Sequence, residues 1–469
     1  MLSRKIAYNT IISAGARIIG LVLSLVVIGF ITRYLGQDGF GYYSTILAFL
    51  FFFTVLADLG LYSICLCEIS RPQADERKIA SNAFTLRFFA GLFIFILSPL
   101  IIYLFPYPIE VKFGVLIGAV GFWIMSNQQV LIGIFQKHLR MDKVAIGELV
   151  GRLVQLGLVV FFIKQDFGFL FIVSALVFGS FMNFILVFFF SQKYIHISFE
   201  FDFVFWRSLL KESLPLALAI IFTMVYFKID TIMLSLMKPA MDVGIYNLAY
   251  KFLESLLFFP AMFVGLIMPL MSEYAFSARE KFKQITQKTL DILLLFIIPM
   301  IIGVIFVSKE AVVLVAGQDF ILSAGVLNIL IIAAGIIFLG VLFSNMIISL
   351  KKQKSLTYIY GLGVIINLIA NFILIPKYSY YGAAWTTLLT ELVVTALMLV
   401  ALSKILDKLP SFKLVFRYLL AGLMMVMVFY FLSNWPLFVL IILSTLIYFG
   451  FLYLIGEFKG LNLVFRKRN

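Results

Sequence analysis

The stretch Arg33-Tyr-Leu-Gly-Gln-Asp-Gly-Phe-Gly41-Tyr-Tyr43 is a short polar segment between two long apolar runs. A related stretch, Lys238-Pro-Ala-Met-Asp-Val-Gly244-Ile-Tyr246, again joins two apolar runs. Gly41 and Tyr43 precede their counterparts Gly244 and Tyr246 by the same 203 residues. Repeats within a membrane protein usually place a transport site between their copies, so this one predicts two related halves.

The composition excludes a soluble globular protein, because 63% of the 469 residues are hydrophobic and only 13% are charged. Apolar runs of about twenty residues or more, each long enough to cross a bilayer as a helix, fill most of the chain. The first run follows a charged tip and shows no small-residue cleavage site, which predicts a retained first helix.

These runs predict an all-α polytopic membrane protein with about fourteen spanning helices. The predicted spans lie near residues 8–32, 42–66, 81–105, 111–136, 144–163, 168–191, 212–237, 243–271, 288–315, 322–350, 355–376, 380–404, 413–433 and 436–457.

The net charge is +14, and the positions of the charged residues along the chain indicate its membrane topology. Most Lys and Arg residues fall in the terminal segments and in loops on one side of the predicted helices, which the positive-inside rule assigns to the cytoplasm. We therefore expect a plasma (inner) membrane protein with both termini cytoplasmic. The charge needs no nucleic acid to explain it, and contact with anionic membrane lipids is expected.

Six helices separate the two related turns, so the two copies should be parallel repeats. We predict an N-terminal six-helix lobe over 1–195, a cytoplasmic linker over 196–211 and a C-terminal six-helix lobe over 212–408. Residues 409–469 should form two additional helices and a basic tail. The first turn is rich in glycine, at Gly36, Gly39 and Gly41, which should allow a tight reversal.

No segment outside the predicted helices is long enough for a catalytic domain, and no phosphate-binding Gly-Lys-Ser/Thr loop occurs. We expect neither an enzyme nor a cofactor. The two histidines lie in loops without neighbouring ligands, so no metal site is expected either. The work of transport should come from a proton or sodium gradient, the membrane potential or the gradient of the substrate.

Charged side chains inside the predicted helices are the candidate functional residues, because each costs about 2.5 to 3.5 kcal/mol at the centre of the bilayer on insertion scales. Two pairs are spaced to neutralise themselves on one helix face, Glu148 with Arg152 and Lys251 with Glu254. The charged residues are Arg17, Asp58, Arg87, Glu148, Arg152, Lys228, Asp230, Lys251, Glu254 and Glu391.

The cations point to an anionic substrate. Arg17, Arg87 and Arg152 each lie about two turns from a cytoplasmic helix end, so their guanidinium forks could meet phosphate oxygens at one level. Lys228 and Lys251 supply further cations from the second lobe. For Arg87, the alternative is a long stem that carries its charge to the membrane surface.

Three acids are candidates for ion coupling or charge balance: Asp58, Asp230 and Glu391. Neither Asp58 nor Arg17 has a partner within its own helix, so they need each other, a ligand or water. Asp230 is equally consistent with a salt bridge to Lys228 or to another helix. A desolvated carboxylate in a membrane cavity can carry a proton or a cation.

Several motifs resemble one family of membrane proteins. Arg33-Tyr-Leu-Gly36, Phe40-Gly41-Tyr-Tyr43 and Asp58-Leu-Gly60 are similar to the opening of bacterial lipid-linked oligosaccharide flippases of the polysaccharide transporter family. Further similar segments are Asp230-Thr-Ile-Met-Leu234, Gly244-Ile-Tyr246-Asn-Leu-Ala249-Tyr-Lys251, Asn367-Leu-Ile-Ala-Asn371 and Tyr381-Gly382-Ala-Ala384.

The resemblance implies two six-helix lobes around a cavity that, by alternating access, moves a polyprenyl-diphosphate-linked glycan of the O-antigen type to the outer leaflet. Its partners would be this glycan, membrane lipids, a glycan polymerase and other surface polysaccharide assembly proteins. Fourteen helices instead of twelve keep two alternatives open, a peptidoglycan-precursor flippase and an ion-coupled small-molecule or multidrug exporter of the same superfamily. A separate alternative is a scaffold of a polysaccharide synthesis complex that transports nothing.

Overall fold

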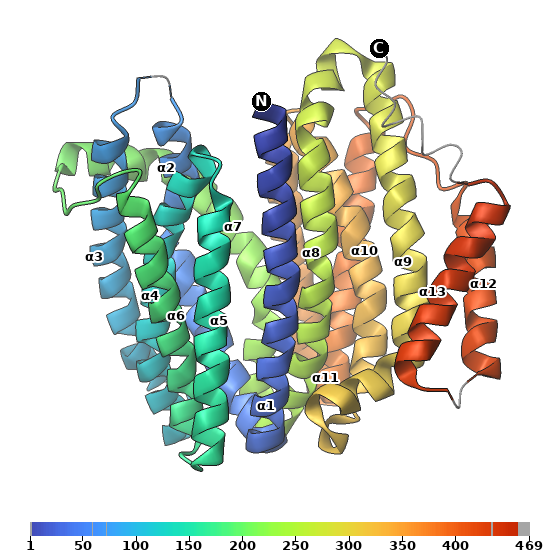
Figure 1. Cartoon of the computed structure of the whole chain (residues 1–469), viewed down its shortest axis with the longest axis horizontal. Coiled ribbons are helices and arrows are strands. Elements are labelled where there is room, and N and C mark those ends of the chain that lie inside the picture. Colours follow the sequence, from blue (N-terminus) through green and yellow to red (C-terminus); the bar gives the residue numbers. More distant parts are fainter. Residues whose placement is uncertain (1, 59, 72, 433–434, 458–469) are drawn as a thin grey trace. The chain divides into compact units, whose positions relative to one another are not determined.

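A computed structural model describes the backbone of residues 2–58, 60–71, 73–432 and 435–457, and their side chains except those of 2–14, 214–220 and 223–226. Within these residues the regular structure is entirely helical (Figure 1). The α-helices are α1 (Leu2–Asp58), α2 (Leu61–Ile69), α3 (Glu76–Ile102), α4 (Ile109–Lys137), α5 (Met141–Lys164), α6 (Phe169–Gln192), α7 (Phe203–Met237), α8 (Ala240–Ser277), α9 (Arg279–Ala316), α10 (Ser323–Ser349), α11 (Gln353–Ser403), α12 (Val415–Phe431) and α13 (Leu437–Leu454).

The fourteen predicted spans correspond to these helices. Ten of the described helices are long and apolar enough to cross a membrane, and two of them, α1 and α11, each contain two predicted spans joined at a kink. The remaining spans fall on α7 and α12. The predicted fold class of an all-α polytopic membrane protein is therefore confirmed.

The kink in α1 occurs at Gly36, whose backbone has φ 66° and ψ −171°. Only glycine adopts this region without strain, so the glycine of the first turn is needed for its backbone. Gly39 and Gly41 were expected to help the reversal in the same way, but neither has a positive φ. Gly41 is required for a different reason, which involves the second turn.

The two related turns, which contain Gly41 and Gly244, pack against each other. A Cβ atom at Gly41 would overlap the carbonyl oxygen of Ala240, and one at Gly244 would overlap the carbonyl oxygen of Gln37. Gln37 and Ala240 are themselves separated by 203 residues. The contact is therefore reciprocal, as expected when two copies of a repeat meet across a local twofold axis.

The chain divides into two compact units. The first comprises Met1–Asn247 with Val315–Asp319, and the second Leu248–Leu314 with Phe320–Asn469. The first unit thus includes α7 and the start of α8. The lobe boundaries predicted near residues 195, 211 and 408 stay a prediction.

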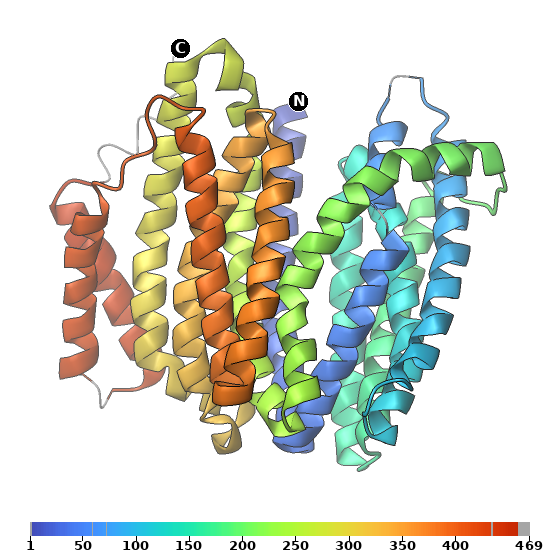
Figure 2. The same ribbon diagram turned by 180° about the vertical axis from the view of Figure 1, so that it is seen from behind.

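Within the first unit, α7 begins across the ends of neighbouring helices and then turns to run alongside them (Figure 2). A core cluster at this end joins α2, α3 and α4 to Leu209 in the first turns of α7. Within the second unit, the α12–α13 hairpin packs on α9 through Met425 and Ile302, and the Tyr448 hydroxyl donates to the carbonyl of Leu295 at 3.0 Å.

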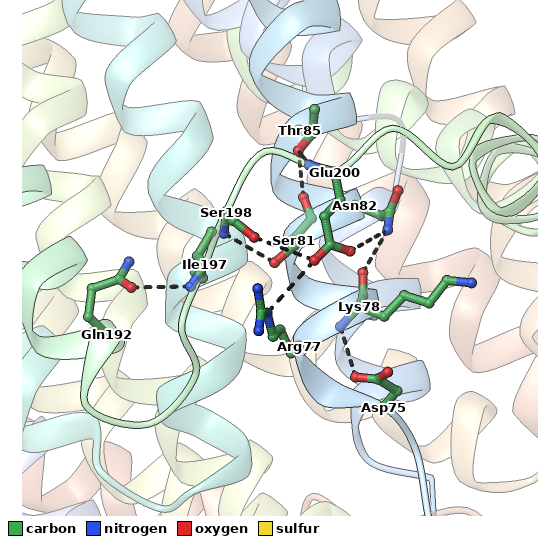
Figure 3. Close-up of polar contacts among 10 residues, drawn as sticks. All are labelled: Asp75, Arg77, Lys78, Ser81, Asn82, Thr85, Gln192, Ile197, Ser198 and Glu200. Atoms are coloured by element: carbon green, nitrogen blue, oxygen red, sulfur yellow. Dashed lines mark hydrogen bonds and ion pairs between the residues drawn. The ribbon is translucent and has the colours of Figure 1, made fainter.

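The segment before α7, residues 196–202, lies on α3 as an extended strap (Figure 3). Alternate backbone N–H groups donate to α3 side chains: Ser198 to Ser81 at 3.3 Å, Glu200 to Thr85 at 3.0 Å and Asp202 to Asn82 at 2.9 Å. In an extended chain alternate residues face opposite ways. Accordingly, the intervening Phe199 and Phe201 are exposed.

Candidate functional site

A cavity of about 440 Å³ lies within the first unit and takes its lining from α1, α4, α5 and α6. Among the residues whose side chains the structure describes, Arg17 lines the cavity from α1, and both polar and apolar residues line it from the other three helices. The lining residues are Arg17, Met125, Gln128, Gln129, Ile132, Val144, Glu148, Gly151, Arg152, Gln155, Leu176, Gly179, Ser180 and Asn183.

Three of the predicted charges meet in this cavity. Arg152 Nη2 donates to Glu148 Oε1 at 3.3 Å, which confirms the pair predicted from their spacing of four residues. Arg17 lines the same space, so two guanidinium groups stand against one carboxylate. Nε of Arg152 is buried and makes no hydrogen bond within the described part of the chain. The lining of the cavity therefore carries more cations than anions, and guanidinium groups form charge-assisted hydrogen bonds with anions.

Glycines bring α5 and α6 close enough to shape this cavity. A Cβ at Gly151 would lie 2.6 Å from the carbonyl oxygen of Gly179, and one at Gly179 would lie 2.8 Å from that of Gly151. On α1, a Cβ at Gly20 would lie 3.5 Å from Nε of Arg152. Small residues at such crossings let membrane helices approach closely.

The uncharged polar residues that line the cavity were not among the site residues predicted from the sequence. Gln128 donates from its amide nitrogen to Asn183 Oδ1 at 3.0 Å, joining α4 to α6, and Gln129, Gln155 and Ser180 line the same cavity. Amides and hydroxyls both donate and accept hydrogen bonds, as sugar hydroxyls require. A signal was present in the run Ser126-Asn-Gln-Gln129, four consecutive polar residues inside an apolar helix.

Arg87 does not line the cavity. Its side chain is 1% exposed, with Nη1 2.5 Å from Asp58 Oδ1 and Nε donating to Ser126 Oγ at 3.2 Å. The alternative in which Arg87 reaches the membrane surface is therefore wrong, because the ion pair compensates the charge inside the helix bundle. The partner of Asp58 is Arg87 on α3, whereas the sequence had suggested Arg17, a ligand or water.

The same carboxylate lies where α1 gives way to α2. Asp58 is the last residue of α1, and its Oδ1 accepts a long hydrogen bond of 3.4 Å from the backbone N–H of Tyr62. Gly60, before α2, has φ 77° and ψ 5°. The predicted span 42–66 is therefore interrupted between α1 and α2, and Arg87 binds Asp58 at this interruption.

Two further candidates belong to the first unit. Asp230 is 3% exposed and accepts from the Tyr246 hydroxyl at 3.2 Å, so the α7–α8 hairpin satisfies part of its hydrogen bonding. Lys228 lies on α7 with Nζ 5.8 Å from the ring centre of Phe51, within the range of a cation–π contact.

The other candidates belong to the second unit. Lys251 Nζ lies 2.8 Å from Glu254 Oε2, which confirms the second pair predicted from sequence spacing. Glu391 is 6% exposed and lies on the second half of α11.

Comparison with known proteins gives two overlapping family matches. The model of a family described as polysaccharide biosynthesis protein matches residues 6–275, and that of the MatE family matches residues 215–373. A putative O-antigen transporter of Shigella dysenteriae is 26% identical over 203 residues, which are 41% of this chain and 48% of that protein. The match thus spans about half the length of this curated relative.

Solved structures share the fold. The Lipid II flippase MurJ in an inward closed conformation is similar with a TM-score of 0.79 and 17% identity, over 96% of this chain and 99% of that chain. An inward-facing multidrug resistance MATE family transporter gives a TM-score of 0.66 and 13% identity, over 84% of this chain and 98% of that chain. At these identities the likeness concerns the fold.

Proposed function

We propose that this chain, which belongs to the polysaccharide biosynthesis protein family, is a flippase for a polyprenyl-diphosphate-linked oligosaccharide. The family and the fold are those of transporters of the multidrug/oligosaccharidyl-lipid/polysaccharide exporter superfamily. The observation that carries the proposal is the cavity in which Arg17 and Arg152 outnumber Glu148.

The chemistry of this cavity suits two adjacent parts of such a substrate, the diphosphate and the first sugar. Guanidinium groups form paired hydrogen bonds with phosphate oxygens, and the attraction strengthens where water is scarce. The amide lining, represented by Gln128 and Asn183, offers donors and acceptors to sugar hydroxyls. We therefore place the diphosphate near Arg17 and Arg152 and the first sugar near the amides.

The remaining candidates keep roles as part of the proposal. Lys228 and Lys251 are further contacts for the diphosphate or for anionic sugars. Arg87 reaches substrate only when its ion pair with Asp58 opens. Asp58, Asp230 and Glu391 balance these charges or couple transport to a proton or sodium gradient. The glycan enters from the cytoplasmic leaflet of the inner membrane and leaves from the outer leaflet for surface polysaccharide assembly.

The test uses purified protein in vesicles with a fluorescent polyprenyl-diphosphate glycan. Arg17→Gln and Arg152→Gln should each slow translocation by about tenfold or more, since each removes a charge-assisted contact. Lys309→Gln, which removes an exposed cation outside the cavity, should leave the rate unchanged. Wild-type rates in both arginine variants, at equal amounts of folded protein, would refute the substrate assignment.

The MatE match over residues 215–373 favours a second candidate, a small-molecule exporter. Such an exporter of cationic drugs needs a cavity with a carboxylate, which Glu148 could supply, but the excess of cations in the cavity disfavours it. Gradient-driven efflux of a cationic dye from the same vesicles, without movement of the glycan, would establish this alternative.

A further inference from the structure

A second pocket, of about 340 Å³, lies within the second unit between the end of α9 and the α12–α13 hairpin. It shares no residue with the cavity around Arg17. Its lining is aromatic and aliphatic with one charged residue. The lining residues are Phe306, Val307, Glu310, Phe429, Tyr430, Trp435, Leu437 and Leu440.

The aromatic residues form a rigid floor and an open rim. The rings of Phe306 and Phe429 are stacked, with centroids 5.1 Å apart and planes within 5° of each other, which joins α9 to α12. Tyr430 and Trp435 are 75% and 52% exposed at the rim. Tyrosine and tryptophan with these exposures are typical of the boundary between lipid tails and headgroups.

Glu310 is the residue that gives this pocket a chemical preference. It follows Phe306 by four residues on α9, so both side chains lie on the same face of the helix. Among the residues that the structure describes, Glu310 has neither a hydrogen bond nor an ion pair. Glu310 is exposed, so its carboxylate is accessible from outside the chain, and a carboxylate beside aromatic rings favours a cationic group as its partner.

The depth of Glu310 identifies the source of that cation. α9 is a membrane-crossing helix that ends at Ala316, six residues later, which is about 9 Å along the helix axis. This short distance from the helix end, together with the exposed Tyr430 and Trp435 at the rim of the pocket, favours a position of Glu310 at the level of the lipid headgroups. Exposed apolar residues continue from the pocket along the hairpin, including Phe438 and Ile442 of α13 and Met427 of α12.

We propose that this pocket binds the headgroup of a phospholipid that carries a primary ammonium, as phosphatidylethanolamine does. The ammonium donates hydrogen bonds to the Glu310 carboxylate and lies against the rings of Tyr430 and Trp435. The acyl chains lie along the exposed apolar residues of α12 and α13. An anionic headgroup is disfavoured, because its phosphate would face Glu310 without an ammonium between them.

The inference is tested on the purified full-length protein by native mass spectrometry of lipid adducts. Phosphatidylethanolamine, phosphatidylcholine and phosphatidylglycerol with identical acyl chains are the probes. The wild type should retain phosphatidylethanolamine about tenfold more tightly than phosphatidylglycerol, as expected for a charge-assisted hydrogen bond. Phosphatidylcholine should bind with intermediate affinity, since methylation keeps the charge and removes the donors.

Two substitutions on α9 separate this site from general lipid binding. Glu310→Gln should abolish the preference for phosphatidylethanolamine, whereas Glu280→Gln should keep it, because Glu280 is an exposed carboxylate near the other end of the helix, paired with Lys283. Tyr430→Leu should weaken the preference about threefold through loss of the ring. Equal binding of the three lipids by the wild type, or an unchanged preference in Glu310→Gln, would overturn the proposal.

Discussion

Arg87 and Asp58 form an ion pair in which the arginine side chain is 1% exposed and the aspartate side chain 19% exposed. The pair links α3 to the point where α1 ends. A guanidinium that is removed from water depends on its carboxylate partner, while the carboxylate keeps some contact with the surroundings. The pair is therefore asymmetric, and each partner should respond differently to substitution.

Removing the carboxylate should be the more damaging change. Asp58→Asn leaves Arg87 charged and buried, and should lower the free energy of unfolding by about 3–5 kcal/mol. Arg87→Met should cost less, because Asp58 can still be hydrated. Thermal unfolding in detergent measures both. If Asp58→Asn were as stable as the wild type, the buried charge would be compensated elsewhere.

The crossing of α5 and α6 gives a matched pair of glycine substitutions. Gly151→Ala should lower the free energy of unfolding by about 1–3 kcal/mol, because its Cβ would meet the backbone of Gly179. Gly157→Ala on the same helix meets no atom within 4 Å and should gain up to about 1 kcal/mol from helix propensity. Opposite shifts in melting temperature test the assignment; parallel shifts would contradict it.

The strap of residues 196–202 depends on Asn82. Its Oδ1 accepts from the backbone of Asp202 and the indole of Trp206, and its Nδ2 donates to Glu200 Oε2. Asn82→Ala should accelerate hydrogen exchange of the strap amides by about tenfold, since at least one buried hydrogen bond is lost. Arg77→Gln is the control, because its ion pair of 3.9 Å with Glu200 is exposed. Equal exchange in both variants would show that Asn82 does not hold the strap.

The end of the strap carries a titratable contact. A hydrogen bond from Lys78 lowers the pKa of Asp202 below its ordinary value of 3.8, and the backbone N–H of Phe205 adds to this. A depressed carboxylate pKa stabilises the folded state above 3.8 and loses this effect as the pH falls through the folded value. Hydrogen exchange of the strap, corrected for intrinsic rates, should therefore not change between about pH 5 and 8. A transition within that range would assign the strap to another titrating group.

Sequence patterns predicted those features that local geometry determines. Apolar runs of bilayer length located the spans, and helical spacing located the pairs Glu148–Arg152 and Lys251–Glu254. The partner of Asp58 was not predictable in the same way, since a contact between α1 and α3 depends on helix packing. The amides of the cavity were not predicted, because charge inside an apolar helix is the signal that marks a candidate residue and an amide is uncharged.

The reciprocal contact of Gly41 and Gly244 has a consequence for how this sequence can change over time. Each glycine is required by the backbone of the other copy, so neither copy can accept a larger residue while its counterpart stays in place. The two turns differ at most other positions, yet at these glycines the backbone of each turn leaves no room for a side chain on the other. A side chain at either position would separate the two turns, so their close contact depends on both glycines at once.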